Sequence, residues 1–378
     1  MELIFGIILG LLILVFLVVV HELGHAIVAR RNGVVVEEFG IGFPPKAWGK
    51  KLKNGVLFTL NWLPLGGFVK LQGEHDAANK KGDYGAASFW QKTKILLAGV
   101  GINWIVAALL LTVLAWTGLP KVLPDQFTVA SDTTITKKPV EIAMLTSGYP
   151  AEKAGLKVGD TIQRFDGQEV PTTQRLIDLT KENKGKTVSV IYTRDGVEAT
   201  KEVTLRDGGD SLLGAGLNQR EELKASWSAP LVGIGTTAQF TWVTLQGLGD
   251  LIGNVVSGFV MQFSFDEQTR QEAGKNLEQA GGSVAGPIGI LGVIFPAAEQ
   301  AGLTQVIFLT AIISLTLAVM NALPIPALDG GRWFVTAIFK LLKKPLTKER
   351  EEKIQGTGFM VLMLLVIVVT ITDIGKLF

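Results

Sequence analysis

Long apolar stretches constrain this chain more than any other feature of its sequence. The first runs from Leu3 to Val20, and three more follow: Ile95 to Leu119, Val306 to Leu328, and Phe359 to Ile371 with its flanks. A helix needs about 20 apolar residues to cross the hydrocarbon core of a bilayer. The first stretch has neither a basic leader nor a small-residue cleavage site, so we expect it to stay as a span. The sequence predicts an α-helical polytopic membrane protein with about four transmembrane helices.

Composition agrees with a membrane protein and excludes several other classes. Hydrophobic residues make up 48% of the chain and charged residues only 19%, below the quarter or so that is usual for soluble domains. The net charge of +2 is too small to suggest nucleic acid as a partner. Cysteine is absent, which rules out disulfides, thiolate metal sites and a cysteine nucleophile.

The distribution of basic residues predicts an orientation. The loops that follow the first and third spans are rich in lysine and arginine, whereas residues 120–304 are mildly acidic. Basic loops stay on the cytoplasmic side of a membrane. We therefore expect both termini and the long middle region to be extracytoplasmic.

A fifth weakly polar segment complicates the count of spans. Ser226 to Phe265 holds a single charge, Asp250, but glycine, threonine, glutamine and asparagine recur along it. A further crossing would also reverse the basic loop after Leu328. We interpret the segment as an interfacial amphipathic helix, with a helix packed on the outer domain as the alternative.

The end of the first span carries a metal-binding motif. His21-Glu22-Leu23-Gly24-His25 fits HExxH, in which two histidines on one helical face bind zinc and the glutamate activates a water molecule. Ionisable residues are expensive inside a span, so they are functional by default. The pattern indicates a peptidase with His21 and His25 as zinc ligands and Glu22 as catalytic base.

The third ligand is predicted from a second polar interruption in apolar sequence. Asp329 ends the stretch Asn321-Ala-Leu-Pro-Ile-Pro-Ala-Leu-Asp329, which two glycines follow. Both motifs lie toward the cytoplasmic ends of their spans. Pro324 and Pro326 should break the helix, which lets Asp329 turn toward the metal. By contrast, His75 lies in polar sequence, and we expect it to be a solvated loop residue.

These two motifs resemble the site-2 protease family of intramembrane zinc metalloproteases, in the bacterial branch that contains the regulator of sigma-E protease. The resemblance covers essentially the whole chain. It implies a Zn²⁺ cofactor, the bacterial inner membrane as location, and single-span membrane-protein substrates such as anti-sigma factors and remnant signal peptides, already shortened by another protease. It also implies that Asn321 contacts the substrate backbone or the developing oxyanion. Arg332 departs from the family, where histidine often follows the paired glycines, and this puts in doubt any supporting role given to that histidine.

Two further segments are similar to the family's substrate-binding β-region. Residues 39–45 and 61–69 alternate glycine, proline and apolar residues, which is typical of a β-hairpin or re-entrant backbone. The family places a re-entrant sheet here, where an unwound substrate can pair by strand addition. An ordinary cytoplasmic hairpin is the alternative. The candidate substrate-binding residues are Asn321, Gly66, Gly67, Pro324 and Pro326.

The middle of the chain resembles a PDZ domain. Residues 147–167, with strand-like segments at Thr187 to Tyr192 and Ala199 to Leu205, carry this resemblance. Such a domain either binds an extended C-terminus or only filters substrates by size, and we favour the filter. The chain has one such domain where the sigma-E branch often has two. The glycines and proline of residues 286–289 are expected to shape a turn.

The predicted organisation has four parts. Residues 1–120 hold the first two spans, the HExxH motif and the β-region, and residues 127–207 form an inserted extracytoplasmic α+β PDZ domain. Residues 208–304 link this domain to the last two spans and the LDG motif in residues 305–378. A metal transporter would distribute its ligands along a path. A catalytically inactive scaffold would not need to keep the two histidines, Glu22 and Asp329. We therefore favour the protease.

Overall fold

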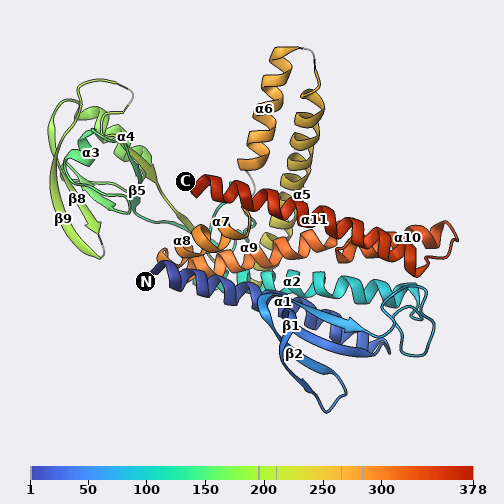
Figure 1. The fold of residues 1–378 in the computed structure, drawn as a ribbon. Coiled ribbons are helices and arrows are strands. Elements are labelled where there is room, and N and C mark those ends of the chain that lie inside the picture. Colours follow the sequence, from blue (N-terminus) through green and yellow to red (C-terminus); the bar gives the residue numbers. More distant parts are fainter. Residues whose placement is uncertain (1, 195, 210, 265, 283–284, 378) are drawn as a thin grey trace. The chain divides into compact units, whose positions relative to one another are not determined.

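The computed structural model describes residues 2–194, 196–209, 211–264, 266–282 and 285–377. The chain divides into two compact units. One comprises Met1–Val113 and Gly233–Phe378, and the other comprises Leu114–Val232. Figure 1 shows the helices and strands of each unit.

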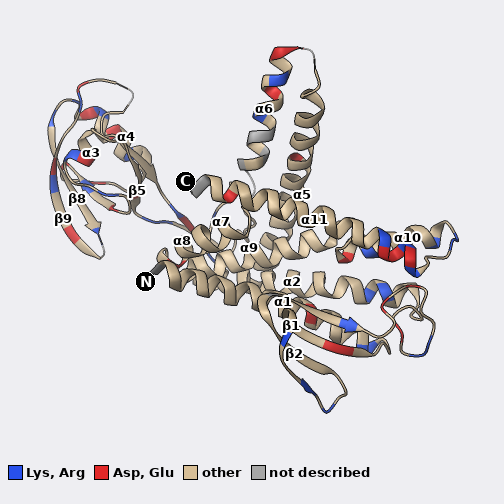
Figure 2. Cartoon of the chain, in the orientation of Figure 1, with Lys and Arg blue, Asp and Glu red and all other residues tan. Residues whose placement is uncertain are grey.

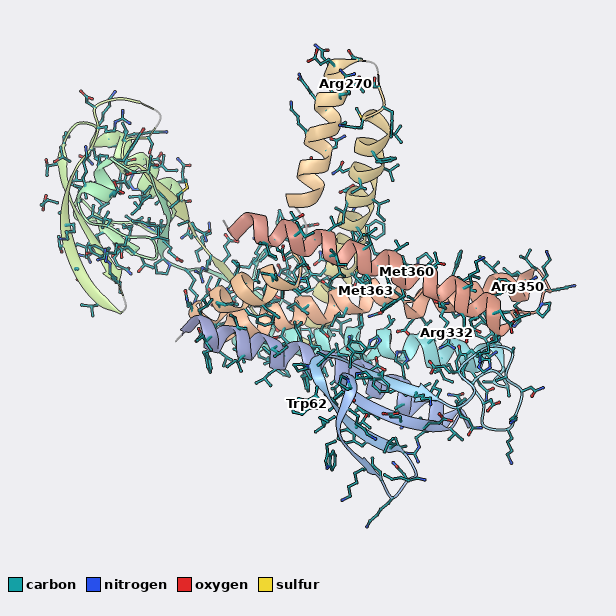
Figure 3. All side chains as sticks on the ribbon, in the orientation of Figure 1. Trp62, Arg270, Arg332, Arg350, Met360 and Met363 are labelled. Carbon is teal, nitrogen blue, oxygen red and sulfur yellow. The ribbon has the colours of Figure 1, made fainter. Side chains whose placement is uncertain are left out.

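Among the described residues, five helices are long and apolar enough to cross a membrane. They are α1 (Glu2–Arg31), α2 (Phe89–Thr117), α5 (Ala229–Met261), α9 (Leu303–Ala322) and α11 (Lys348–Leu377). The ribbons of α1, α2, α9 and α11 are mostly uncharged, and charged residues gather near α10, where α11 begins (Figure 2). Side chains such as Met360 and Met363 are exposed on α11, as expected of a surface that faces lipid (Figure 3).

The fifth candidate is the segment that we expected to lie in the interface. Residues 229–261 form one continuous helix, α5, so the structure has one candidate span more than the four predicted. Its polar residues do not break the helix because they bond to their own backbone: Thr237 donates to Gly233 O and Thr241 donates to Thr237 O, each at 2.7 Å. α6 (Glu267–Gly282) follows as a polar helix.

Short helices lead from α6 to α9. α7 (Pro287–Gly289), a π-helical turn η1 (Ile290–Ile294) and α8 (Phe295–Gln300) run in succession. The Asp373 carboxylate on α11 accepts from the backbone N–H groups of Gly286 and Gly289, at 3.1 and 2.8 Å. The segment expected to form a turn thus begins a helix, because a buried carboxylate supplies the acceptor that its first N–H groups need.

Two bent strands follow α1. β1 (Val36–Lys51) and β2 (Leu57–Leu71) pair antiparallel, and each pairs in two halves because prolines interrupt it. The first half of β1 lies between the two halves of β2: Phe39, for example, pairs with both Val69 and Phe58. In the described pairing, residues 67–71 are bonded on one side only, so this segment is an edge of the sheet. Trp62 lies on β2, two residues before Pro64, and is 71% exposed (Figure 3).

A break in the helix separates α9 from α10 (Asp329–Leu341). Leu323 is extended because it precedes Pro324, and Leu328 is also extended at the start of α10. Glycines let this turn pack closely: a Cβ on Gly331 would lie 1.9 Å from Ile325 O, and one on Gly358 of α11 would lie 2.5 Å from Pro326 O. The Ala327 N–H also donates to Gln355 Oε1 of α11 at 2.6 Å. The predicted helix break is therefore fixed in one conformation.

The second unit is an α+β domain with its own apolar core. Its main sheet has the strand order β10-β5-β6-β8-β9, with β7 beside β6, and a smaller sheet has the order β3-β11-β4. Residues such as Ile142, Phe165 and Leu176 fill the core and are fully buried. The main sheet extends past the predicted domain end at residue 207, because β10 pairs with β5.

The strands of this unit are β3 (Leu119–Pro120), β4 (Thr134–Lys137), β5 (Val140–Leu145), β6 (Thr161–Phe165), β7 (Gln168–Glu169), β8 (Thr187–Arg194), β9 (Val197–Thr204), β10 (Ala215–Asn218) and β11 (Glu221–Lys224). Its helices are α3 (Pro150–Lys153) and α4 (Thr173–Glu182).

Candidate metal centre

His21 and His25 lie on one face of α1, because residues four apart on a helix are neighbours. Both are buried, with 7% and 8% of their surface exposed. Their Nε2 atoms are 3.1 Å apart. The ring nitrogens of the HExxH motif therefore converge on one point inside the helical unit.

Asp329 completes a triangle with the two histidines. Its Oδ2 lies 3.0 Å from His21 Nε2 and 3.2 Å from His25 Nε2. In a tetrahedral zinc site with bonds of 2.0–2.1 Å, neighbouring ligand atoms are about 3.3 Å apart. His21, His25 and Asp329 are also the described residues grouped closely enough to hold a metal ion. Three side chains of types that zinc accepts thus have the spacing that a zinc site requires.

Two features of α2 support a metal at this point. His25 Nδ1–H donates to the carbonyl oxygen of Ile95 at 2.7 Å, which leaves Nε2 of the neutral ring with a free lone pair. A Cβ on Gly99 would lie 2.5 Å from His25 Nε2 and 2.6 Å from His21 Nε2. The absence of a side chain at residue 99 leaves space beside the ligand atoms, and the donor set fits zinc.

Glu22 lies next to this triangle but is not part of it. It shares the wall of a cavity of about 880 Å³ with His25 and Asp329. Gly67 on β2 packs against it: a Cβ added there would lie 3.6 Å from Glu22 Cγ. The carboxylate therefore lies between the ligand atoms and the edge of the sheet.

Comparison with known proteins identifies the family. The chain matches the model of Peptidase family M50 over residues 9–365, which is nearly its whole length. The chain belongs to peptidase family M50. A Clostridium perfringens protein that carries a zinc metalloprotease name is 32% identical, with 97% of this chain and 98% of the relative covered.

Two further M50 relatives bear more specific names. The zinc metalloprotease RasP of Bacillus licheniformis is 28% identical over 97% of this chain and 98% of its own, and the regulator of sigma-W protease RasP of Bacillus subtilis is 27% identical over 96% of each. The predicted family, the enzyme class and the zinc cofactor are confirmed. The chain is a zinc metalloprotease of family M50 and a multi-pass membrane protein.

Part of the chain is also similar to solved PDZ domains. The PDZ domain of an SdrC-like protein from Listeria innocua is 27% identical, covers 22% of this chain and 93% of its own, and has a TM-score of 0.19. A second, from Listeria monocytogenes, is 24% identical over 21% of this chain and 86% of its own, with a TM-score of 0.19.

The other residues predicted for this M50 site are more scattered. Asn321 is half-buried in the last turn of α9, and its Nδ2 donates to Leu317 O at 3.0 Å. Gly66, at a φ of +80°, lies where the two halves of β2 meet, and a Cβ there would lie 2.7 Å from Phe43. Pro324 and Pro326 shape the turn before Asp329. Their substrate-binding roles stay predictions.

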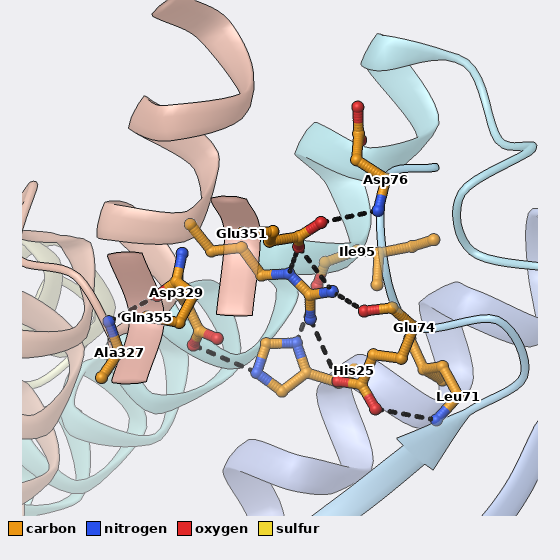
Figure 4. Close-up of polar contacts among 10 residues, drawn as sticks. His25, Leu71, Glu74, Asp76, Ile95, Ala327, Asp329, Glu351 and Gln355 are labelled. Atoms are coloured by element: carbon orange, nitrogen blue, oxygen red, sulfur yellow. Dashed lines mark hydrogen bonds and ion pairs between the residues drawn. The ribbon is translucent and has the colours of Figure 1, made fainter. Parts of the chain in front are cut away.

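A charged cluster forms another part of the cavity wall. The Arg332 guanidinium donates to Glu74 Oε1 at 3.0 Å, to the Glu74 carbonyl and to Glu351 Oε1 at 3.3 Å. Glu351 Oε2 also accepts from the Asp76 N–H at 2.7 Å (Figure 4). Arg332 thus joins the loop after β2 to α10 and α11. His75, expected to be solvated, is half-buried in that loop and lines the cavity.

Sequence reasoning missed three contributions of α2: the Ile95 carbonyl, the open space at Gly99, and Asn103. A backbone carbonyl and a glycine give no signal that sets them apart in an apolar span. Asn103 does give one, since a polar amide in the middle of an apolar helix needs a partner. Its side chain is fully buried and lies 3.5 Å from His21 Nδ1.

Proposed function

We propose that this M50 peptidase cleaves single-span membrane proteins within the bilayer, with His21, His25 and Asp329 as zinc ligands and Glu22 as the general base. The observation that carries the proposal is the triangle of ligand atoms at 3.0–3.2 Å, with Glu22 on the wall of the same cavity.

His21, His25 and Asp329 would hold the zinc, which would polarise the carbonyl of the substrate and lower the pKa of a bound water molecule toward about 7. The Glu22 carboxylate takes a proton from the attacking water and delivers it to the amine that leaves. Its place on the cavity wall, next to His25 and Asp329, suits both transfers. Asn321 uses one hydrogen of its NH₂ group on Leu317 O, so the other is left to donate to the substrate backbone.

The edge of the sheet at residues 67–71 is the proposed site of substrate binding. A transmembrane helix must unwind before its peptide bonds can be attacked, and its freed N–H and C=O groups then need partners. An edge strand offers them. Because Phe68, Val69 and Leu71 line the cavity together with Glu22, a substrate strand paired here would pass beside the proposed base.

The proposed setting is the bacterial inner membrane. Both termini and the PDZ domain would be extracytoplasmic, and the active site would lie toward the cytoplasmic side, since basic residues follow the first span and Asp329. A relative named as regulator of sigma-W protease supports anti-sigma factors as substrates, with remnant signal peptides as a second group. We propose that substrates arrive already shortened by another protease, and that the PDZ domain excludes those that are not.

The test uses the full-length protein in detergent and a tagged single-span anti-sigma-factor fragment whose extracytoplasmic part has been removed. Glu22→Gln should keep stoichiometric zinc and lose cleavage by about 10²- to 10⁴-fold, because only the base is removed. Asp329→Ala should lose both zinc and cleavage. Glu349→Gln, an exposed carboxylate of α11 that is not among the residues of the cavity wall, is the control and should keep both. Normal turnover by Glu22→Gln would exclude the general-base role.

A further inference from the structure

Asn103 is held firmly in the middle of α2. It is fully buried, and its own backbone carbonyl accepts a hydrogen bond from Ser314 Oγ of α9 at 2.9 Å. Burying an amide without hydrogen bonds destabilises a protein. The side chain of Asn103 therefore needs polar partners, and its surroundings show which one is available.

The partner is the ring nitrogen of His21 that faces away from the metal position. Asn103 Nδ2 lies 3.5 Å from His21 Nδ1, while Asn103 Oδ1 is buried without a hydrogen-bond partner. The two orientations of an amide differ only by exchange of nitrogen and oxygen, and the hydrogen-bond network decides between them. Rotating this amide by half a turn places Oδ1 toward His21 Nδ1 and gives the unpartnered oxygen a donor.

Metal binding requires that orientation. When His21 Nε2 binds a cation, the proton of the neutral ring must be on Nδ1, and Nδ1–H then needs an acceptor. An Asn103 NH₂ group facing Nδ1 would place donor against donor. An Asn103 carbonyl oxygen accepts the proton and selects the tautomer whose Nε2 lone pair faces Asp329.

α2 also provides an acceptor for the second histidine, His25. His25 Nδ1–H donates to the Ile95 carbonyl of α2. Ile95, Gly99 and Asn103 are spaced by four residues, so they lie on one face of α2. This face supplies an acceptor for each histidine and, at Gly99, the space between them.

We infer that Asn103 is a positioning residue for the metal centre, whose side-chain oxygen accepts from His21 Nδ1–H. The inference rests on the proposed zinc ligands. It adds a side chain to the backbone carbonyl of Ile95 and the space at Gly99 that α2 already contributes to the site. Neighbouring acceptors of this kind usually change metal affinity by about 10- to 100-fold when they are removed.

The experiment measures zinc affinity of the full-length protein in detergent by competition with a chelator. Asn103→Leu should bind zinc about 10- to 100-fold more weakly than wild type. Asn103→Asp, which keeps an acceptor oxygen, should stay within a few-fold of wild type. Thr112→Val is the matched control, because Thr112 is another buried polar residue of α2 but bonds only to its own helix, at Ala108 O.

The outcomes separate this inference from the proposed metal centre. If wild type binds zinc and His21→Ala does not, the metal centre stands. Unchanged affinity in Asn103→Leu would then overturn the role of Asn103, as would equal losses in Asn103→Leu and Asn103→Asp. If Asn103→Leu does not fold, Asn103→Ala makes the same comparison with a smaller side chain. Zinc binding that does not depend on His21 would overturn the proposed centre itself.

Discussion

The cluster at Asp329 and the cluster at Arg332 begin on the same turn of α10, but their polar groups are satisfied in opposite ways. Around Arg332, each carboxylate faces a donor: Glu74 and Glu351 face the guanidinium, and Glu351 also faces the Asp76 N–H. Around Asp329, His21 Nε2, His25 Nε2 and Asp329 Oδ2 lie 3.0–3.2 Å from one another. On the proposed ligand set, with both histidines neutral, all three atoms present lone pairs to one point. The first cluster is complete within the chain, whereas the second, on that assignment, needs a cation.

The difference shows how a binding site can be told from a structural network. Both clusters contain buried charged groups, both join segments far apart in the sequence, and both line the same cavity. Burial and charge therefore do not separate them. The balance of donors and acceptors does, because like groups stay close together only where a partner of opposite kind lies between them.

The largest effect is expected from a substitution that disrupts the metal cluster without changing a proposed ligand. In Gly99→Ala, the new Cβ would lie 2.5 Å from His25 Nε2, so the histidines must move. We expect zinc affinity to fall by about 100-fold, and zinc content after gel filtration measures it. Gly101→Ala is the control, because a Cβ there meets nothing within 4 Å. Wild-type zinc content in Gly99→Ala would show that the ligands do not need this space.

A smaller effect is expected from breaking the charged cluster. Arg332→Met leaves Glu351, whose side chain is 6% exposed, without its cation, and removing one partner of a buried pair costs about 3 kcal/mol. Thermal unfolding should therefore begin at a lower temperature, by a similar amount with zinc bound and after chelation. Arg350→Met, an exposed arginine of α11, is the control (Figure 3). A loss of zinc affinity beyond about threefold in Arg332→Met would contradict the separation of the two clusters.

The smallest effect concerns a third polar cluster, in the second unit. Hydrogen bonds from the Ser226 and Ser228 hydroxyls hold the pKa of Asp132 well below its usual range. A lowered pKa stabilises the fold above the unfolded value of about 3.9, and this contribution is lost as the pH falls through the folded pKa. Asp132→Asn should therefore lower the unfolding temperature slightly at pH 7, with a difference from wild type that shrinks below about pH 4. A difference independent of pH would contradict the role of the charge.

The sequence predicted the chemistry better than the architecture. HELGH and the stretch that ends at Asp329 predicted the family and the zinc metalloprotease class because their residue types are rare in apolar sequence. The same reasoning interpreted α5 as an interfacial helix and not as a span, since its threonines are polar by composition but bond to their own helix. Asn103 escaped notice because its partner, His21, is 82 residues away, and only the packing of α2 on α1 brings them together.

The distance along the chain between the ligands has a consequence for synthesis. His21 and Asp329 are 308 residues apart, with the whole second unit between them. A nascent chain that has inserted its first helices carries two histidines and the base but no carboxylate to complete the triangle. On the proposed ligand set, the protease is inactive until Asp329, 308 residues after His21, has been translated. This delay protects the membrane proteins made beside it from an incomplete enzyme.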